Sequence, residues 1–245
     1  MVLTVQRDAH LRQLDGLQNG LMFCIWAGLN PMSAQRMQAL LSIQFNAGCP
    51  VMCLTAANIA EWQHPDQPFH PAFEFLSATH KADYLRVYLM HHYGGGYTDI
   101  KHTQRPWPPF FEQLQAAPDC DGLGYTEIGP NGVAPLPPPM GDELRANYQR
   151  LIGLCAFVFR KQSRFTSAWF AATESLLDSK LDALRANPAR HPQDQTNAPF
   201  TDGTRSPYPL AWTELLGNIF HPLVLQMHER IVHDSSIAPA FSNYR

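Results

Sequence analysis

Short apolar runs alternate with amphipathic stretches along the first part of the chain. Residues 21–26 and 49–55 are apolar and end in turn-forming or polar residues, which predicts two buried strands. Between them, residues 31–45 place apolar side chains at helical spacing and predict a helix with Pro31 in its first turn. The order strand, helix, strand predicts an α/β fold, with a mainly parallel central sheet flanked by helices.

Residues 79–93 have the clearest helical pattern in the chain. Their apolar side chains share one face, and Thr79 is the expected N-cap. The glycines at 94–96 are expected to end this helix, and a short strand over residues 97–100 follows.

Beyond residue 104 regular patterns are fewer. Residues 104–150 contain several prolines and are predicted to be irregular. A strand is expected over residues 154–160, and a long helix over 163–187. A polar loop over 188–209 then leads to a last helix over 209–232, which is expected to break near Pro222.

Composition and local polarity limit the binding partners and the cellular location that we expect for the protein. The 245 residues include 18 basic and 21 acidic side chains, and no basic block stands out, so a nucleic-acid partner is not expected. The amino-terminal residues are polar, and the apolar run over 21–29 is too short to span a bilayer. We therefore expect a cytoplasmic protein with no transmembrane segment, and peripheral attachment to the inner face of a membrane stays open.

Charged residues gather in the stretch "KADYLRVYLMHHYGGGYTDIK" at 81–101. Asp83 and Arg86 are three residues apart and share one face of the predicted helix. Asp99 follows at the end of a short strand, which is where open α/β sheets bind ligands. These groups are expected to meet in one cleft, where they suit sugar hydroxyls and phosphate oxygens. The spacing alone fits a solvated Asp83–Arg86 ion pair equally well.

The full stretch resembles the DxD-region glycosyltransferases of the capsular polysaccharide synthesis and initiating mannosyltransferase-like group, which share a core with the large clostridial glucosylating toxins. The shared pattern is an Asp and an Arg on a helix, followed by Gly-Gly-x-Tyr-x-Asp-x-Asp. The resemblance implies a GT-A (Rossmann-like) fold and a single domain over residues 1–245. It also implies a nucleotide-sugar core at about 20–103, with an acceptor and lid portion at about 104–245.

The resemblance also implies roles for individual residues. Trp26, in "MFCIWAG", matches a tryptophan that stacks on the donor base, although a strand-end core aromatic is an equally good interpretation without that context. Asp83 and Arg86 match residues that hold the donor sugar and its phosphate side. Tyr97 belongs to the same donor-binding pattern, and Asp99 matches the first Asp of the DxD pair.

Lys101 departs from the family pattern, which has a second Asp there to bind Mn²⁺ or Mg²⁺. A charged lysine cannot ligate a cation. Its ammonium could replace the metal and neutralise the leaving diphosphate, which is the interpretation we favour. Alternatively the site is degenerate, or a metal is kept through Asp99 with Glu214 or His221.

The stretch "SPYPLAWTELLGNIFHP" at 206–222 supplies candidates on the acceptor side. Glu214 could hold an acceptor hydroxyl or stabilise positive charge on the sugar, and Trp212 could stack on a sugar face. His221 is a further candidate, although a structural role suits it better. A helix-terminal carboxylate and a core tryptophan are the alternatives for Glu214 and Trp212. The segment "EIGPNGVA" at 127–134 is expected to border a cleft.

The resemblance thus implies a hexosyltransferase that moves a sugar from a UDP- or GDP-sugar to a glycan or lipid-linked glycan acceptor. The resemblance implies retention of configuration and a role in bacterial surface or capsular polysaccharide synthesis. Asp99, Lys101 and Glu214 are the predicted catalytic residues. A catalytically inactive protein of the same fold, which binds nucleotide sugars or glycans, is the alternative, and a nucleotide-sugar hydrolase ranks last.

Overall fold

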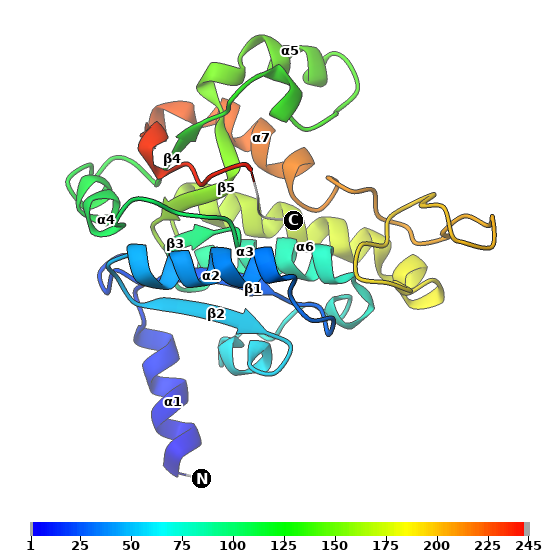
Figure 1. Cartoon of the computed structure of the whole chain (residues 1–245), viewed down its shortest axis with the longest axis horizontal. Helices are drawn as coiled ribbons and strands as arrows, with labels where there is room; N and C mark the ends of the chain where they lie inside the picture. The colour runs from blue at the N-terminus through cyan, green and yellow to red at the C-terminus, as the bar shows by residue number, and fades with distance from the viewer. Residues whose placement is uncertain (1, 243–245) are drawn as a thin grey trace.

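A single mixed sheet runs through the computed structural model, which describes residues 2–242 (Figure 1). Its strand order is β2-β1-β3-β5-β4-β6, and β5 alone runs opposite to the other five. The strands are β1 (Met22–Trp26), β2 (Val51–Thr55), β3 (Gly95–Thr98), β4 (Gly122–Thr126), β5 (Ile152–Phe159) and β6 (Ile231–His233). The predicted α/β class, with a mainly parallel sheet, is confirmed at this level.

Helices cover both faces of the sheet. The α-helices of residues 2–242 are α1 (Val2–Gln13), α2 (Ala34–Asn46), α3 (Ala78–His92), α4 (Pro108–Gln115), α5 (Met140–Ala146), α6 (Arg164–Ala186) and α7 (Gly217–Gln226). Of these, α1 projects away from the sheet (Figure 1). Alternate side chains of β1 point to opposite faces. Met22 packs in one apolar cluster with residues of α2 and α4, whereas Phe23 and Ile25 pack in another with residues of α3, α6 and α7.

The connections from β1 to β2 and from β2 to β3 place β2 and β3 on opposite sides of β1. The chain passes from β1 through α2 to β2, and then returns through α3 to β3 on the other side of β1. Ligands of open α/β sheets bind at the carboxyl ends of the strands where the strand order changes direction in this way. Trp26 ends β1 and Asp99 directly follows β3, so both lie at this edge of the sheet.

Several predicted boundaries need correction. The α2 helix begins at Ala34 rather than in the turn of Pro31, because Ser33 Oγ accepts a hydrogen bond from the Arg36 N–H and caps it. Ser77 caps α3 in the same way, so Thr79 is not the N-cap. The β3 strand covers 95–98 instead of 97–100, because Gly95 already pairs with Phe159 of β5.

Two larger predictions for the second half were wrong. Residues 104–150 are not irregular throughout, since they contain α4, β4 and α5, with Pro108 in the first turn of α4. Residues 209–232 are not one helix broken at Pro222. The α7 helix runs through Pro222, held by the buried Phe220 and Val224 on either side, and the chain then forms β6 beside β4.

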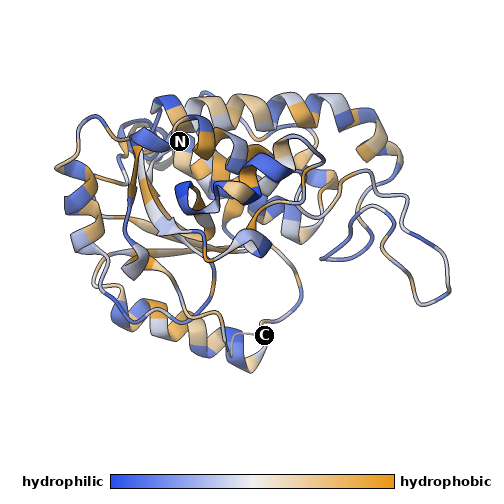
Figure 2. Ribbon diagram, turned by 90° about the horizontal axis from the view of Figure 1, so that it is seen from above, coloured by the Kyte–Doolittle hydropathy of each residue, from blue (hydrophilic) through white to orange (hydrophobic). Residues whose placement is uncertain are grey.

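Other predictions for this half hold. The α6 helix matches the predicted 163–187 closely, with Ser163 as its N-cap, and β5 matches the predicted strand over 154–160 with an earlier start. The loop over 188–209 projects from the molecule and is mostly hydrophilic (Figures 1 and 2). Within residues 2–242, none of the helices combines the length and the apolar character that crossing a bilayer would require.

Candidate functional site

Asp99 is half-buried and is the centre of a charged cluster at the carboxyl edge of the sheet, whose other side chains are buried. Its Oδ1 accepts hydrogen bonds from Tyr97 Oη at 2.9 Å and from Arg86 Nη2 at 3.3 Å. Its Oδ2 accepts a hydrogen bond from Lys101 Nζ at 2.9 Å. Burial alone would raise the pKa of Asp99, but Arg86 and Lys101 outweigh it and lower the pKa to about 2. Asp99 is therefore ionised at neutral pH.

Arg86 reaches this cluster from α3. Its guanidinium lies over the Tyr97 ring, with Cζ 4.4 Å from the ring centroid, and Nη1 donates to the Leu154 carbonyl at 2.7 Å. The side chain is almost fully buried, yet Nε has no hydrogen-bond partner among the described residues. Buried donors of this kind are costly to leave unpaired, so the unpaired Nε is an unusual feature of this cluster.

Asp83 lies one helical turn before Arg86, and its Oδ1 is 3.6 Å from Arg86 Nη2. This contact is longer than the Arg86–Asp99 contact, and Asp83 accepts no hydrogen bond from any residue in 2–242. Burial raises the pKa of Asp83 to about 7 against the opposing charge of Arg86. At neutral pH its carboxyl group is divided between the acid and the carboxylate, and it can donate or accept a hydrogen bond.

Lys101 completes the cluster from the loop after β3. Besides Asp99, its Nζ contacts Cys155 Sγ on β5 at 2.7 Å and lies 5.3 Å from the ring centroid of Phe241. Burial favours the neutral amine, but Asp99 and Cys155 outweigh it and raise the pKa of Lys101. Lys101 therefore carries a full positive charge at neutral pH.

A pocket of about 480 Å³ opens beside Lys101. The rest of its lining consists of Tyr125, the loop over 127–132, Leu154, Cys155 and Phe241. The terminal segment is tied down here, because the Ala240 N–H donates to the His102 carbonyl at 2.8 Å. The expectation that residues 127–134 border a cleft is therefore confirmed for 127–132. Cys155 and Phe241 are site residues that the sequence had not identified, and no chemistry had been assigned to Glu127 within the segment 127–134.

Trp26 lies at the same edge, at the end of the strand next to β3. Its indole N–H donates to the Asn30 carbonyl at 2.8 Å, and the ring is half-buried. It does not line the pocket beside Lys101. The face of its ring, rather than its N–H, is the part that a ligand could contact.

The segment that carries Trp212 and Glu214 is attached to the first turn of α3. His80 Nε2 lies 3.1 Å from the Ala211 carbonyl oxygen. Glu214 Oε1 contacts Lys180 Nζ at 2.9 Å, and Oε2 accepts from the Ala211 N–H at 2.8 Å, so neither oxygen is bound to the Asp99 cluster. Trp212 is 44% exposed. Both residues remain predictions for the acceptor side.

His221 is fully buried in α7 and cannot contact an acceptor directly. Its Nδ1 accepts a hydrogen bond from the Ala134 N–H at 3.0 Å, and its Nε2 lies 3.7 Å from Glu127 Oε2. Burial lowers the pKa of His221 to about 4, so the ring is neutral at pH 7. His221 supports the wall of the pocket.

The side chains around Asp99 do not fit a divalent cation. A metal ion on Asp99 Oδ2 would lie against the Lys101 ammonium, and Oδ1 is occupied by Tyr97 and Arg86. Glu214 and His221, the other ligands considered, have the partners described above. Across residues 2–242, no group of three or more His, Cys, Asp or Glu side chains has an arrangement suited to a metal ion.

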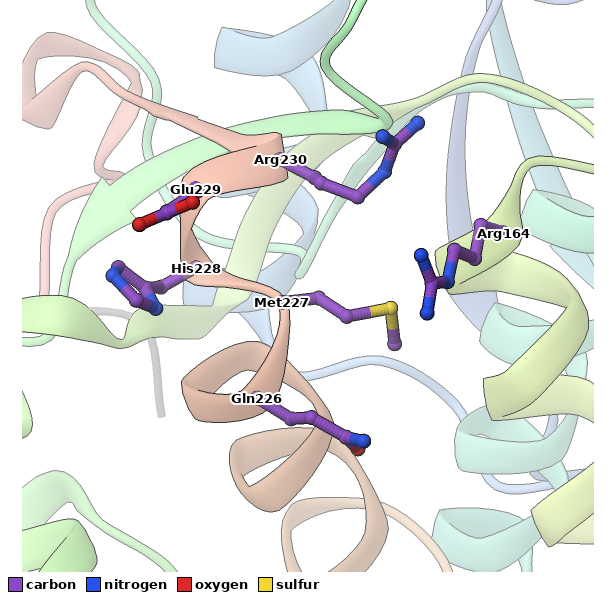
Figure 3. Close-up of a pocket in the computed structure, with 6 residues that line it drawn as sticks. All are labelled: Arg164, Gln226, Met227, His228, Glu229 and Arg230. Atoms are coloured by element: carbon purple, nitrogen blue, oxygen red, sulfur yellow. The ribbon is translucent and has the colours of Figure 1, made fainter.

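A second pocket, of about 510 Å³, lies at the opposite edge of the sheet, where β4 and β6 begin. In Figure 3, Arg164 and Met227 point toward one another across it, whereas Glu229 points away. Arg230 is engaged by both oxygens of Asp121 at 2.8 and 2.9 Å, and Asp121 Oδ2 also accepts from the Phe165 N–H at the start of α6. These contacts join β4, α6 and β6, which is a structural role.

Comparisons of the chain with models of protein families, with curated proteins and with solved structures found no match. The fold shown by the structure is α/β with a mixed six-stranded sheet. The GT-A fold stays a prediction, because no family or solved structure was matched.

Asp83→Asn is expected to stabilise the protein more at pH 8 than at pH 4. The pKa of about 7 lies above the usual value of 3.8. Between these values the folded protein binds more protons than the unfolded chain, so the free energy of unfolding falls as pH rises from about 4 to about 7. The difference amounts to at most about 4 kcal/mol.

Urea unfolding of the wild type and the variant at both pH values measures this difference. Asp182→Asn is the matched control, because Asp182 is exposed on α6. An equal effect of Asp83→Asn at pH 4 and pH 8 would contradict a raised pKa.

Proposed function

We propose that the protein is a glycosyltransferase that moves a sugar from a nucleotide-sugar donor to a glycan acceptor, with a lysine in place of a metal ion. The observation that carries the proposal is the contact of Lys101 with Asp99, at the position where the similar family has its second Asp. The carboxyl edge of the sheet and the adjoining pocket support it, because both suit a ligand.

The charges of the cluster favour a diphosphate. Arg86 and Lys101 supply two positive charges, Asp99 supplies one negative charge, and Asp83 is only partly ionised at neutral pH because burial holds its pKa at about 7. These four side chains therefore carry a net positive charge. Positive groups fixed in a buried site stabilise the charge that develops on a leaving diphosphate as the bond to the sugar breaks.

The roles of the remaining residues follow from their place at this edge. The Asp83 carboxyl group is free of hydrogen bonds from the described residues and would bind a sugar hydroxyl. Trp26 would stack on the base through its ring face. Tyr97 holds Asp99 in place through its hydroxyl group. Surface or capsular polysaccharide is the proposed product, and UDP- or GDP-sugars are the proposed donors.

A thermal-shift panel of UDP-, GDP-, CMP- and dTDP-sugars tests this proposal. We expect one class of donor to raise the melting temperature by several degrees at about 100 times its Kd, because ligand binding stabilises the folded state. The shift should be unchanged by EDTA and by added Mn²⁺, since Lys101 occupies the position of the metal.

Free sugars at the same concentration are the control. A shift that requires Mn²⁺ would contradict the role of Lys101, and no shift with any donor would contradict the function itself. Binding without turnover would favour the inactive binding protein.

A further inference from the structure

Glu127 is the carboxylate on the far side of the pocket from β3. It directly follows β4, a strand that runs in the same direction as β3, so Glu127 and Asp99 project from the same edge of the sheet. Glu127 is only 7% exposed, and it lines the pocket together with Lys101. Its Oε1 accepts a hydrogen bond from the Ile128 N–H at 2.9 Å.

The neutral His221 ring has one N–H group, and this group faces Glu127. A neutral imidazole has one nitrogen that donates and one that accepts. Because Nδ1 accepts from the Ala134 N–H, the proton is on Nε2, which lies 3.7 Å from Glu127 Oε2. Nε2 is buried and has no hydrogen-bond partner among the described residues. A small movement of Glu127 when a ligand binds would complete this hydrogen bond.

The Glu127 carboxylate lies close against Gly132 in the loop over 129–132. A Cβ on Gly132 would lie 2.2 Å from Glu127 Oε1 and 2.7 Å from Glu127 Cδ. Gly129, at the other end of the same loop, has nothing within 4 Å of the corresponding position. A side chain at Gly132 would therefore displace the Glu127 carboxylate, whereas one at Gly129 would not.

We propose that Glu127 is a catalytic residue, which binds the acceptor hydroxyl in this pocket and takes its proton, and that His221 is its positioning residue. The inference rests on the proposed glycosyltransferase function. A bond forms between the acceptor oxygen and C1 of the sugar, and the bond from C1 to the diphosphate oxygen breaks. The electron pair leaves with the diphosphate beside Lys101, and the hydroxyl proton passes to Glu127 and later to water.

The surroundings of Glu127 suit a general base. Burial raises its pKa, opposed by the hydrogen bond from the Ile128 N–H, which makes it a stronger base than an exposed carboxylate. The other titratable groups that face it are Tyr125, Lys101 and Cys155 across the pocket and His221 behind it. The cleft therefore has a cation on the leaving-group side and a base on the acceptor side.

The experiment compares Glu127→Gln, Gly132→Ala and Gly129→Ala with the wild type. Donor affinity is measured by thermal shift with the nucleotide sugar that binds. Turnover is measured as release of nucleoside diphosphate with water and with methyl glucoside, galactoside and mannoside as acceptors. We expect Glu127→Gln to lower turnover about 100-fold or more at unchanged donor affinity. Gly132→Ala should lower turnover as well, and Gly129→Ala should not.

His221→Asn tests positioning, because Asn can still accept from the Ala134 N–H but has no donor in the place of Nε2. We expect the acidic limb of the pH–rate profile to shift in His221→Asn and to disappear in Glu127→Gln. A structural role alone would change the melting temperature and leave the limb in place.

Equal turnover of Glu127→Gln and wild type would overturn the inference and leave the proposed function intact. If no nucleotide sugar binds, or if a donor binds without turnover of the wild type, the proposed function itself fails. Turnover of the wild type therefore distinguishes the two failures.

Discussion

Lys101→Met is expected to lower the rate of sugar transfer by about 10²–10³-fold. The substitution keeps the length of the side chain and removes the charge that we place beside the leaving diphosphate. Donor binding should weaken as well, because Arg86 is then the only cation of the cluster. Release of nucleoside diphosphate from the donor identified by thermal shift measures the rate.

Lys81→Met is the matched control, since Lys81 is a half-buried lysine of α3 that contacts the Phe73 ring and not the Asp99 cluster. The melting temperatures of both variants show whether they fold, because breaking a buried ion pair can cost about 3–5 kcal/mol. Asp99 keeps Arg86 and Tyr97 as partners, so Lys101→Met should remain folded. A folded variant with the turnover of the wild type would contradict the role assigned to Lys101.

His92→Phe is expected to stabilise the protein by about 3 kcal/mol more at pH 4 than at pH 7. Burial, with the neighbouring His91 and His64 adding to it, lowers the pKa of His92 to about 3. The unfolded chain therefore binds more protons than the folded protein below about pH 6.5, and the stability of the wild type falls as pH falls through this range. Phenylalanine removes this titration.

The substitution suits its surroundings, because the His92 ring packs against Tyr88 and Phe170 and its Nε2 has no hydrogen-bond partner among the described residues. Urea unfolding at pH 4 and pH 7 measures the difference. His10→Phe is the control at an exposed position of α1. An equal effect of His92→Phe at both pH values would show that His92 is protonated in the folded protein.

The sequence predicted the elements in which local pattern and tertiary packing agree. The strand near residues 21–26 and the helix over 163–187 have apolar spacing and caps that also suit their places in the core. The β4 strand lacked such a pattern because it contains Gly122 and Gly124. A Cβ there would lie 2.3 Å from the Phe159 ring and 2.7 Å from Ile152 Cδ1, so packing against β5 requires glycines that a strand pattern disfavours.

The same limit applies to the candidate site. The meeting of Asp83, Arg86 and Asp99 was predictable, because it depends on one helix, one turn and one strand close together in the chain. The pairing of Glu127 with His221 joins residues on β4 and α7, and no local pattern connects them. The available signal was a carboxylate directly after a strand, which became visible only once β4 was recognised.

The place of Phe241 has a practical consequence for labelling. Phe241 contacts Lys101 and the Tyr125 ring, so a bulky group attached at this position would compete with substrates for space beside the pocket. The α1 helix projects away from the sheet (Figure 1). Fluorophores and surface tethers therefore belong on exposed positions of α1 such as His10, where they leave the entrance to the pocket open.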